Sequence, residues 1–149
     1  MRKFEVVNEN MRKILNVETI LPTRSSKNSA GYDFRSKIHT IVKPNEIVKI
    51  WTDIKAQMEE NDVLMLFPRS SMSGKFMLAN TIGIVDSDYY SNKNNDGNIG
   101  IFLINISNEN QEINVGDRIA QGVFLKYEIC ENDESKEIRI GGFGSSGVW

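Results

Sequence analysis

The chain has very little cysteine, histidine and proline, and it has no long apolar run. Its 149 residues include one cysteine, one histidine and three prolines. A lone cysteine excludes an intrachain disulfide and a zinc site built from several cysteines, and it predicts a cytoplasmic protein. No apolar stretch is long enough for a membrane span or a signal peptide, so we expect neither.

An excess of charge of one sign is also missing. The formal net charge is −2, from 18 Lys and Arg residues and 20 Asp and Glu residues spread along the chain. Proteins that bind nucleic acid concentrate Lys and Arg in a basic stripe that neutralises phosphates, and this sequence has no such stripe. We therefore expect no nucleic-acid or membrane partner, and any nucleotide ligand should be a single molecule. The length predicts one compact domain.

Short apolar segments bounded by polar residues make up much of the chain. They are rich in Ile, Val, Leu and Phe and too short for an apolar-faced helix, which predicts β-strands. The segments are residues 38–43, 46–52, 62–67, 99–106 and 118–127. Pro44 and Asn45 favour a turn and predict a hairpin between the first two segments. The pattern predicts an all-β sandwich or barrel with at most one short helix, expected around residues 73–79.

Five polar clusters lie between these segments in a fixed order. Strand ends and turns are where an all-β scaffold displays chemistry, so the clusters hold the candidate functional residues. They are residues 30–34 (AGYDF), 68–72 (PRSSM), 80–89 (NTIGIVDSDY), 116–121 (GDRIAQ) and 141–147 (GGFGSSG). In content and order they resemble the five motifs of the trimeric dUTPases.

The resemblance implies a fold, an activity and an assembly. The implied fold is a distorted jelly roll, and the implied assembly is a homotrimer with shared active sites. The implied reaction is hydrolysis of dUTP to dUMP and pyrophosphate, which limits uracil incorporation into DNA and supplies dUMP for dTMP synthesis. The implied substrate and cofactor are dUTP and Mg²⁺.

The third motif contains the candidate catalytic residue. If this stretch is extended, Asp86 and Asp88 face the same side, as in a metal site or a base with a supporting acid; a surface turn is the alternative from the residues alone. The resemblance implies that Asp86 activates the attacking water, a general-base role. Tyr89, which on its own is typical of a half-buried aromatic, matches the tyrosine that packs on deoxyribose and excludes a 2′-hydroxyl.

Residues 80–85 and the strand at residues 97–105 match the segments whose main chain pairs with uracil. Backbone donors and acceptors can imitate a base-pairing partner there. A simple turn former is the alternative interpretation of Asn80. The resemblance thus implies substrate contacts at Asn80, Gly83, Val85 and Ile99.

The second and fourth motifs are candidates for phosphate binding. Arg69, Ser70 and Ser71 follow an apolar strand, where backbone N–H groups and hydroxyls can converge on an anion; a capped turn is the alternative. The resemblance assigns them to the phosphates together with Gln121, although Ser71 replaces a usual glycine. It also implies that Asp33 helps to organise Mg²⁺ through water, while the triphosphate supplies most other ligands.

The C-terminal residues 139–149 are predicted to form a flexible arm that closes over a β domain of residues 1–138. Four glycines among residues 141–147 make this segment costly to order, which is typical of an arm that closes on its ligand. By resemblance Phe143 stacks over uracil. Substrate binding is further assigned to Gly144 and, at the terminal phosphates, to Arg139, Ser145 and Ser146.

Residues 90–96 stand where the family pattern has one residue. Since residues 91–97 lack apolar side chains, we expect an exposed loop that the fold tolerates, and a candidate surface for a regulatory protein partner. Two other functions remain open. A dCTP deaminase shares the implied fold but needs a glutamate in the strand at residues 99–105, which has no carboxylate. A regulatory protein that only binds nucleotide is the second alternative.

Overall fold

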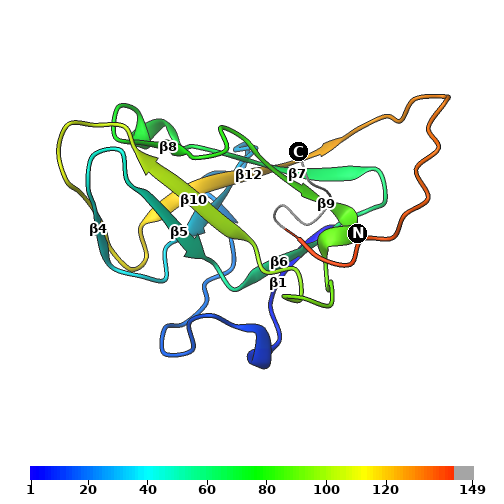
Figure 1. Cartoon of the computed structure of the whole chain (residues 1–149), viewed down its shortest axis with the longest axis horizontal. Coiled ribbons are helices and arrows are strands. Elements are labelled where there is room, and N and C mark those ends of the chain that lie inside the picture. The colour runs from blue at the N-terminus through cyan, green and yellow to red at the C-terminus, as the bar shows by residue number, and fades with distance from the viewer. Residues whose placement is uncertain (143–149) are drawn as a thin grey trace.

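Short strands connected by turns make up the protein, and a computed structural model describes them for residues 1–142 (Figure 1). The strands are β1 (Lys3–Val6), β2 (Thr23–Arg24), β3 (Tyr32–Arg35), β4 (Thr40–Val42), β5 (Ile47–Trp51), β6 (Ile54–Gln57), β7 (Asp62–Phe67), β8 (Phe76–Leu78), β9 (Gly83–Asp86), β10 (Gly100–Asn105), β11 (Gln111–Ile113) and β12 (Arg118–Lys126). The single-turn 3₁₀ helices are η1 (Glu9–Met11), η2 (Ser70–Met72) and η3 (Ser87–Tyr89). No helix in this part of the chain is long and apolar enough to cross a membrane.

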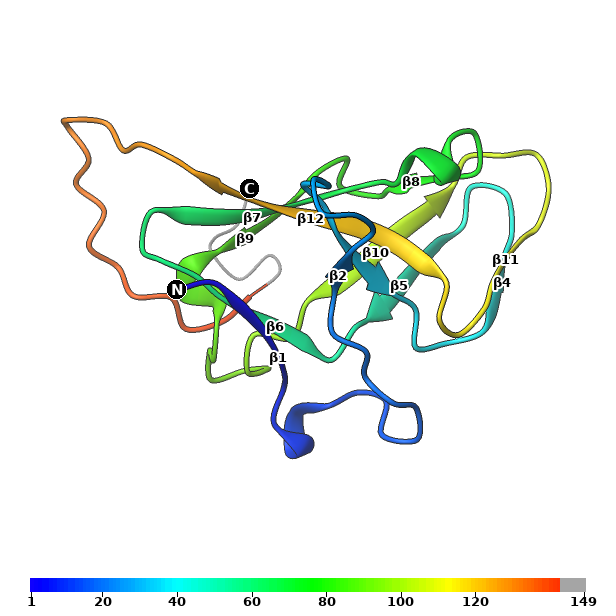
Figure 2. The ribbon, with the colours of Figure 1, turned by 180° about the vertical axis from the view of Figure 1, so that it is seen from behind.

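The strands pair antiparallel in two larger sheets and two ribbons. One sheet has the order β2-β3-β12-β7-β9 and the other the order β5-β10-β8, while β4 pairs with β11 and β1 with β6. Figures 1 and 2 show β12 and β7 crossing the direction of β10 and β5. The all-β, distorted jelly-roll fold predicted from the sequence is confirmed.

The core lies between the two larger sheets. Along β7 the side chains alternate between buried and half-buried, the period-two pattern of a strand with one face on the core. Leu64 and Leu66 of β7 belong to one buried cluster with Ile101 and Leu103 of β10. This packing holds β9, which pairs with β7, in a fixed position relative to β10.

Two local expectations are wrong. The turn at Asn45 forms, with φ of 63° and a hydrogen bond from the Glu46 N–H to the Lys43 oxygen of 3.0 Å. The strands on either side of the turn do not form a hairpin, however, because β4 pairs with β11 and β5 pairs with β10. The expected helix at residues 73–79 is replaced by β8, whose alternating burial and pairing with the end of β10 favour a strand.

The expectation of an exposed loop at residues 91–97 is also wrong. Asn92 and Asp96 are buried, and only Ser91, Lys93 and Asn94 within this segment are exposed. The Asp96 carboxylate forms a salt bridge of 2.9 Å with Lys55 of β6 and accepts the Asn8 N–H at 2.7 Å. Polar residues are buried here because each finds a hydrogen-bond partner elsewhere in the fold.

The chain beyond β12 leaves the body of the protein and returns. Residues 127–142 have no regular secondary structure. In Figures 1 and 2 this orange-to-red segment swings outward and comes back beside η3 and β9. It therefore brings the start of the predicted C-terminal arm to the third motif.

Candidate active site

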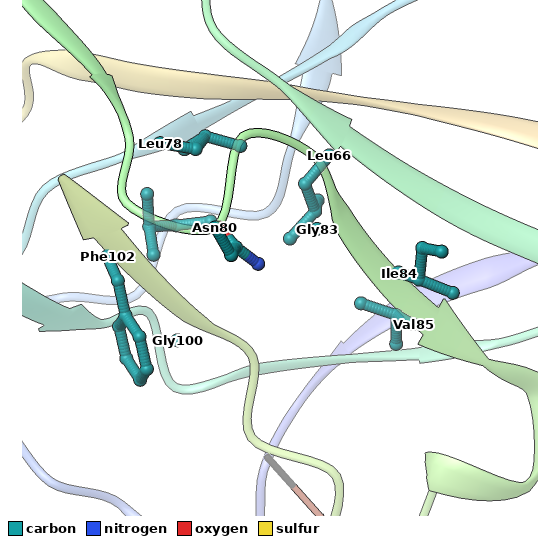
Figure 3. A pocket seen from close by; sticks show the side chains of 9 residues that line it. Leu66, Leu78, Asn80, Gly83, Ile84, Val85, Gly100 and Phe102 are labelled. Atoms are coloured by element: carbon teal, nitrogen blue, oxygen red, sulfur yellow. The ribbon is translucent and has the colours of Figure 1, made fainter. Parts of the chain in front are cut away.

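A narrow pocket lies between β9 and β10. β9 is an edge strand that pairs with β7 alone, and β8 pairs only with residues 103–105 at the far end of β10. Among the described strands, Gly100 and Ile101 therefore have no strand partner on the side of β9. Figure 3 shows the pocket, whose lining residues are Leu66, Leu78, Asn80, Gly83, Ile84, Val85, Gly100, Ile101 and Phe102.

The pocket contains three of the four positions predicted to bind the base. Asn80, Gly83 and Val85 line it, and the Asn80 side chain points into the space between the strands (Figure 3). Ile99 does not line it, because Ile99 is fully buried and its N–H and C=O bond to Ile54 and Thr52. The neighbouring Gly100 takes that place. The cavity volume is about 10 Å³, roughly the space for one water molecule, so the pocket as it stands does not enclose a pyrimidine ring.

Asp86 and Asp88 lie just beyond this pocket and converge on one arginine. Asp86 is the last residue of β9, and η3 carries Asp88. Arg139 donates from Nη2 to Asp86 Oδ2 at 2.5 Å and from Nε to Asp88 Oδ1 at 2.7 Å. The carboxylates share a side although the backbone turns into a 3₁₀ helix. The geometry favours a functional pair over an ordinary surface turn, because two half-exposed carboxylates and an arm residue meet at one point.

Tyr89 is more buried than its motif predicts. Its side chain is 4% exposed, and its hydroxyl donates to the Asn98 carbonyl at 2.5 Å and accepts from Asn95 Nδ2 at 2.7 Å. Burial raises the pKa of Tyr89 to about 12, although the Asn95 hydrogen bond and the Arg139 charge act in the opposite direction. Gly142 lies against the ring, where a Cβ would be 1.9 Å from Cε2. Only glycine permits so close an approach.

We expect the Tyr89 phenol to ionise near pH 12 in the folded protein. Because its pKa is raised above the ordinary tyrosine value of 10.0, its contribution to stability is complete below about pH 10 and is lost as the pH rises towards 12. Absorbance at the tyrosinate band, measured for the parent and for Tyr89→Phe, isolates this group by difference. A step near pH 10 in the difference curve would contradict the expectation.

The first, second and fourth motifs meet at another place on the five-stranded sheet. Gln121 of β12 is opposite Asp33 of β3 and Phe67 of β7. Arg69 Nε donates to Asp33 Oδ1 at 2.7 Å, and Arg69 Nη1 donates to Ser71 Oγ at 3.0 Å. Gln121 Nε2 donates to the Pro68 oxygen at 3.0 Å. The pairing register of three adjacent strands thus assembles the predicted phosphate-binding residues.

A cavity of about 270 Å³ adjoins this cluster, and its lining includes Arg69, Ser71, Lys75 and Arg118. Ser70 lies exposed in η2 beside it. Arg118 Nη1 lies 3.5 Å from Asp33 Oδ2, so Asp33 holds two arginines. The lining also includes Glu112 and Asp117, so cationic and anionic side chains are mixed, and the guanidinium and hydroxyl groups are the ones suited to an anion. Lys75 lies outside the five motifs, whereas Arg118 belongs to the fourth motif.

A dedicated metal cage is not found within residues 1–142. No group of three His, Cys, Asp or Glu side chains in this part of the chain could hold an ion. Asp33 Oδ1 is engaged by Arg69, whereas Oδ2 has only the longer Arg118 contact. The Oδ2 atom therefore remains the one suited to accept from a water on an ion.

Within one chain, the residues around Asp86 and the residues around Arg69 lie far apart. Asp86 is opposite Val63 at the start of β7, whereas Arg69 follows the end of β7 at Phe67, six residues further along. At about 3.3 Å per residue the separation is roughly 20 Å. This is longer than the triphosphate of a nucleotide. The remaining predicted contacts, Phe143, Gly144, Ser145 and Ser146, lie outside the described residues.

Comparisons with known proteins identify the family of the chain. The dUTPase family model matches residues 17–147. The deoxyuridine 5′-triphosphate nucleotidohydrolase of Lactococcus lactis subsp. lactis (strain IL1403) is 39% identical, over 99% of this chain and 99% of that protein. The crystal structure of dUTPase from Streptococcus mutans matches with a TM-score of 0.75 and 33% identity, over 87% of this chain and 98% of that one. The Staphylococcus bacteriophage 80alpha dUTPase with dUPNHPP has a TM-score of 0.65 and 26% identity, over 99% of both chains. The chain therefore belongs to the dUTPase family.

Proposed function

We propose that the protein hydrolyses dUTP to dUMP and pyrophosphate, which limits uracil in DNA and supplies dUMP for dTMP synthesis. The observation that carries this proposal is the Asp86 carboxylate at the end of β9, directly beyond a pocket walled by β9 and β10, in a chain of the dUTPase family. The pocket presents main-chain groups of an edge strand to a base, and Asp86 follows where the α-phosphate would lie. The single cysteine, Cys130, supports a cytoplasmic location.

The reaction is an in-line displacement at the α-phosphorus. Asp86 accepts a proton from water as the water oxygen bonds to phosphorus, and the bond from phosphorus to the bridging oxygen breaks to release pyrophosphate. A well-placed base contributes roughly 10²–10⁴-fold. Charge that develops on the leaving pyrophosphate is stabilised by fixed cationic donors, usually the larger part of catalysis.

Arg139 connects the arm to this chemistry. Its guanidinium lies within hydrogen-bond distance of both Asp86 and Asp88, so it already stands at the reacting centre. We assign it to the phosphates of the bound nucleotide, as its place in the tail motif implies. Phe143 and the two serines that follow would complete the cover over the base and the terminal phosphates.

The proposed cofactor is Mg²⁺, carried mainly by the triphosphate. Mg²⁺ prefers phosphate oxygens and retains several waters, so it needs few direct protein ligands. Asp33 is the protein group proposed to hold one of those waters, through its Oδ2 atom. When bound, the ion would offset negative charge on the phosphates.

The proposed assembly is a homotrimer with shared sites. Since Asp86 and Arg69 lie roughly 20 Å apart along β7, the phosphate-binding residues near Asp86 have to come from another subunit. Large apolar side chains also lie on the surface, including Ile84 of β9 at 63% exposure. Side chains of this kind suit a subunit contact.

The insertion, which is residues 90–96, exposes little surface to a regulatory protein partner. A protein that recognised residues 90–96 would meet mainly Ser91, Lys93 and Asn94, because Asn92 and Asp96 are buried. We propose the enzymatic activity as the function, and these three exposed residues are the surface through which a regulatory partner would contact the segment.

A substrate panel tests the proposal. The purified protein is incubated with Mg²⁺ and with dUTP, UTP, dTTP or dCTP in turn, and pyrophosphate and ammonia are measured. We expect pyrophosphate from dUTP and little from the other nucleotides. Ammonia from dCTP would identify a deaminase instead. Binding of dUTP without turnover would favour a regulatory protein.

Truncation after Ile138 is expected to lower kcat/KM for dUTP by at least roughly 10- to 100-fold. Loss of one charge-assisted hydrogen bond from Arg139 accounts for that much, and loss of the cover over the site adds to it. The fold should remain, since residues 139–142 have no regular secondary structure and the last strand of the described sheets ends at Lys126.

Truncation after Gly142 is the matched control for the role of Arg139. It retains Arg139 and should show a smaller loss than the longer truncation. Circular dichroism and size-exclusion chromatography check the fold and the assembly. Parental kcat/KM after truncation at Ile138 would refute a role for the arm, and an unfolded product would make the arm part of the fold.

A further inference from the structure

We propose that Asn95, which the insertion supplies, is a positioning residue that holds Tyr89 in place and thereby sets the preference for dUTP over UTP. The inference rests on the proposed function and on the packing of the Tyr89 ring against the deoxyribose, which the resemblance to the dUTPases implies. No motif of the sequence points to Asn95. Its role emerges from the contacts of the insertion.

Within residues 1–142, Asn98 and Asn95 form hydrogen bonds with the Tyr89 hydroxyl. It donates its proton to the Asn98 carbonyl at 2.5 Å and accepts from Asn95 Nδ2 at 2.7 Å. A phenol has one proton to donate, so the second partner has to be a donor. Together the two bonds fix the position of the hydroxyl at the far end of the ring, in addition to the packing around a side chain that is 4% exposed.

The orientation of the Asn95 amide follows from its other contacts. Its Oδ1 accepts from the Gly97 N–H at 3.0 Å and from Asn92 Nδ2 at 2.7 Å. Because the oxygen faces two N–H donors, the amide nitrogen has to be the atom that faces Tyr89. Asn95 is thus a donor towards the ring and cannot flip without losing three hydrogen bonds.

The rest of the insertion holds Asn95 in place. Asn92 Nδ2 donates to the Tyr89 carbonyl at 2.8 Å, which fastens the start of the loop to η3. At the other end, Asp96 is tied to Lys55 of β6 at 2.9 Å. Gly97 has φ of +83°, and a Cβ there would lie 3.0 Å from the Ser91 nitrogen, so the turn is tightly closed. The insertion, residues 90–96, is therefore a tightly hydrogen-bonded loop beside Tyr89.

The second partner of Tyr89 is equally fixed. Asn98 Oδ1 accepts from the Asp53 N–H at 2.9 Å, and Asn98 Nδ2 donates to Asp53 Oδ1 at 2.9 Å. Asp53 is fully buried and forms a salt bridge with Lys37 at 2.7 Å. Asn98 is therefore held by the core, whereas Asn95 is held by residues 90–96 and is the partner that the insertion adds. Exclusion of a 2′-hydroxyl needs a ring that cannot retreat, because selectivity of this kind relies on steric conflict with the unwanted ligand.

Asn95→Asp tests the inference with a nearly isosteric change. It retains Oδ1 and its two accepted hydrogen bonds but replaces the donor towards Tyr89 by an oxygen. We expect the ratio of kcat/KM for dUTP to that for UTP to fall roughly 2- to 10-fold, the effect of one neutral hydrogen bond. Asn94→Asp is the matched control, with the same change of charge on an exposed neighbour. That variant should keep the parental ratio.

A double-mutant cycle separates positioning through Tyr89 from a general effect on the loop. Tyr89→Phe retains the ring, removes the hydroxyl and should lower the ratio by a similar factor. If Asn95 acts through that hydroxyl, adding Asn95→Asp to Tyr89→Phe changes the ratio no further. Full additivity of the two changes would overturn the inference. A parental ratio in Tyr89→Phe would also overturn it, even if the Asn95 variant did not fold.

Tyr89→Ala distinguishes failure of this inference from failure of the proposed site. If Tyr89→Ala kept the parental ratio, the assignment of Tyr89 to the sugar would be wrong. If Tyr89→Ala lowered the ratio while Asn95→Asp did not, only the positioning role of Asn95 would fail. A spectroscopic readout is independent of activity. Because the Asn95 hydrogen bond lowers the pKa of Tyr89, Asn95→Asp should move its titration to higher pH.

Discussion

Asp86→Asn is expected to lower kcat for dUTP by roughly 10²–10⁴-fold with little change in dUTP binding. An amide cannot take a proton from water at neutral pH, so the base contribution to the chemical step is lost. The amide oxygen can still accept from Arg139, which contacts Asp86 at 2.5 Å in the parent, so the local geometry is retained. Loss confined to kcat is the sign of an interaction made in the transition state.

Asp88→Asn is the control for Asp86→Asn. It makes the same change of charge next to the same arginine, since Asp88 accepts from Arg139 Nε at 2.7 Å. Steady-state release of pyrophosphate gives kcat, and calorimetric titration with a dUTP analogue gives binding. Only the Asp86 variant should lose turnover by orders of magnitude. Turnover of Asp86→Asn within a few-fold of the parent would reject Asp86 as the base, and equal losses in both variants would assign the effect to charge.

The strands that are short apolar runs were predictable, but their partners were not. The segments at residues 62–67 and 118–127 correspond to β7 and to β12 with one additional residue. Local pattern is sufficient there, because short apolar runs bounded by polar residues indicate strands. The choice of β11 as the partner of β4 depends on residues about 70 positions away in the chain. The turn predicted at Asn45 is therefore present, but the hairpin predicted between the strands on either side of it is not.

The site was predictable as separate motifs, whereas its assembly came from the register of the sheet. Gln121 meets Asp33 and Pro68 only because β3, β12 and β7 are neighbours in that order. Gly100, which lines the base pocket in place of Ile99, lies in an apolar strand that carries no chemical signal. The roughly 20 Å between Asp86 and Arg69 is likewise a consequence of strand pairing.

The insertion at residues 90–96 shows that polar composition alone does not indicate exposure to solvent. Asn92 and Asp96 have the composition of a solvated loop, yet both are buried because Lys55, the Asn8 N–H and the Tyr89 carbonyl satisfy them. A single sequence does not reveal such partners, since they are distant along the chain. The insertion is thus part of the fold, and its removal should have a cost in stability.

Deletion of residues 91–96 is expected to lower the free energy of unfolding by about 3–5 kcal/mol, the usual cost of leaving one member of a buried ion pair without its partner. The deletion removes Asp96 and leaves the Lys55 amine, whose side chain is 9% exposed, without its carboxylate. It also removes the Asn92 and Asn95 contacts to Tyr89. Urea denaturation followed by circular dichroism measures the change.

Two matched variants assign that loss to the buried pair. Lys93→Ala changes an exposed residue of the same loop and should leave stability within about 0.5 kcal/mol of the parent. Combining the deletion with Lys55→Met removes the unpaired charge and retains an apolar side chain of similar length, so part of the lost stability should return. A deletion variant with the parental denaturation midpoint would show that residues 91–96 do not contribute to stability. A loss that Lys55→Met does not relieve would transfer the cost from the ion pair to the altered course of the backbone between η3 and β10.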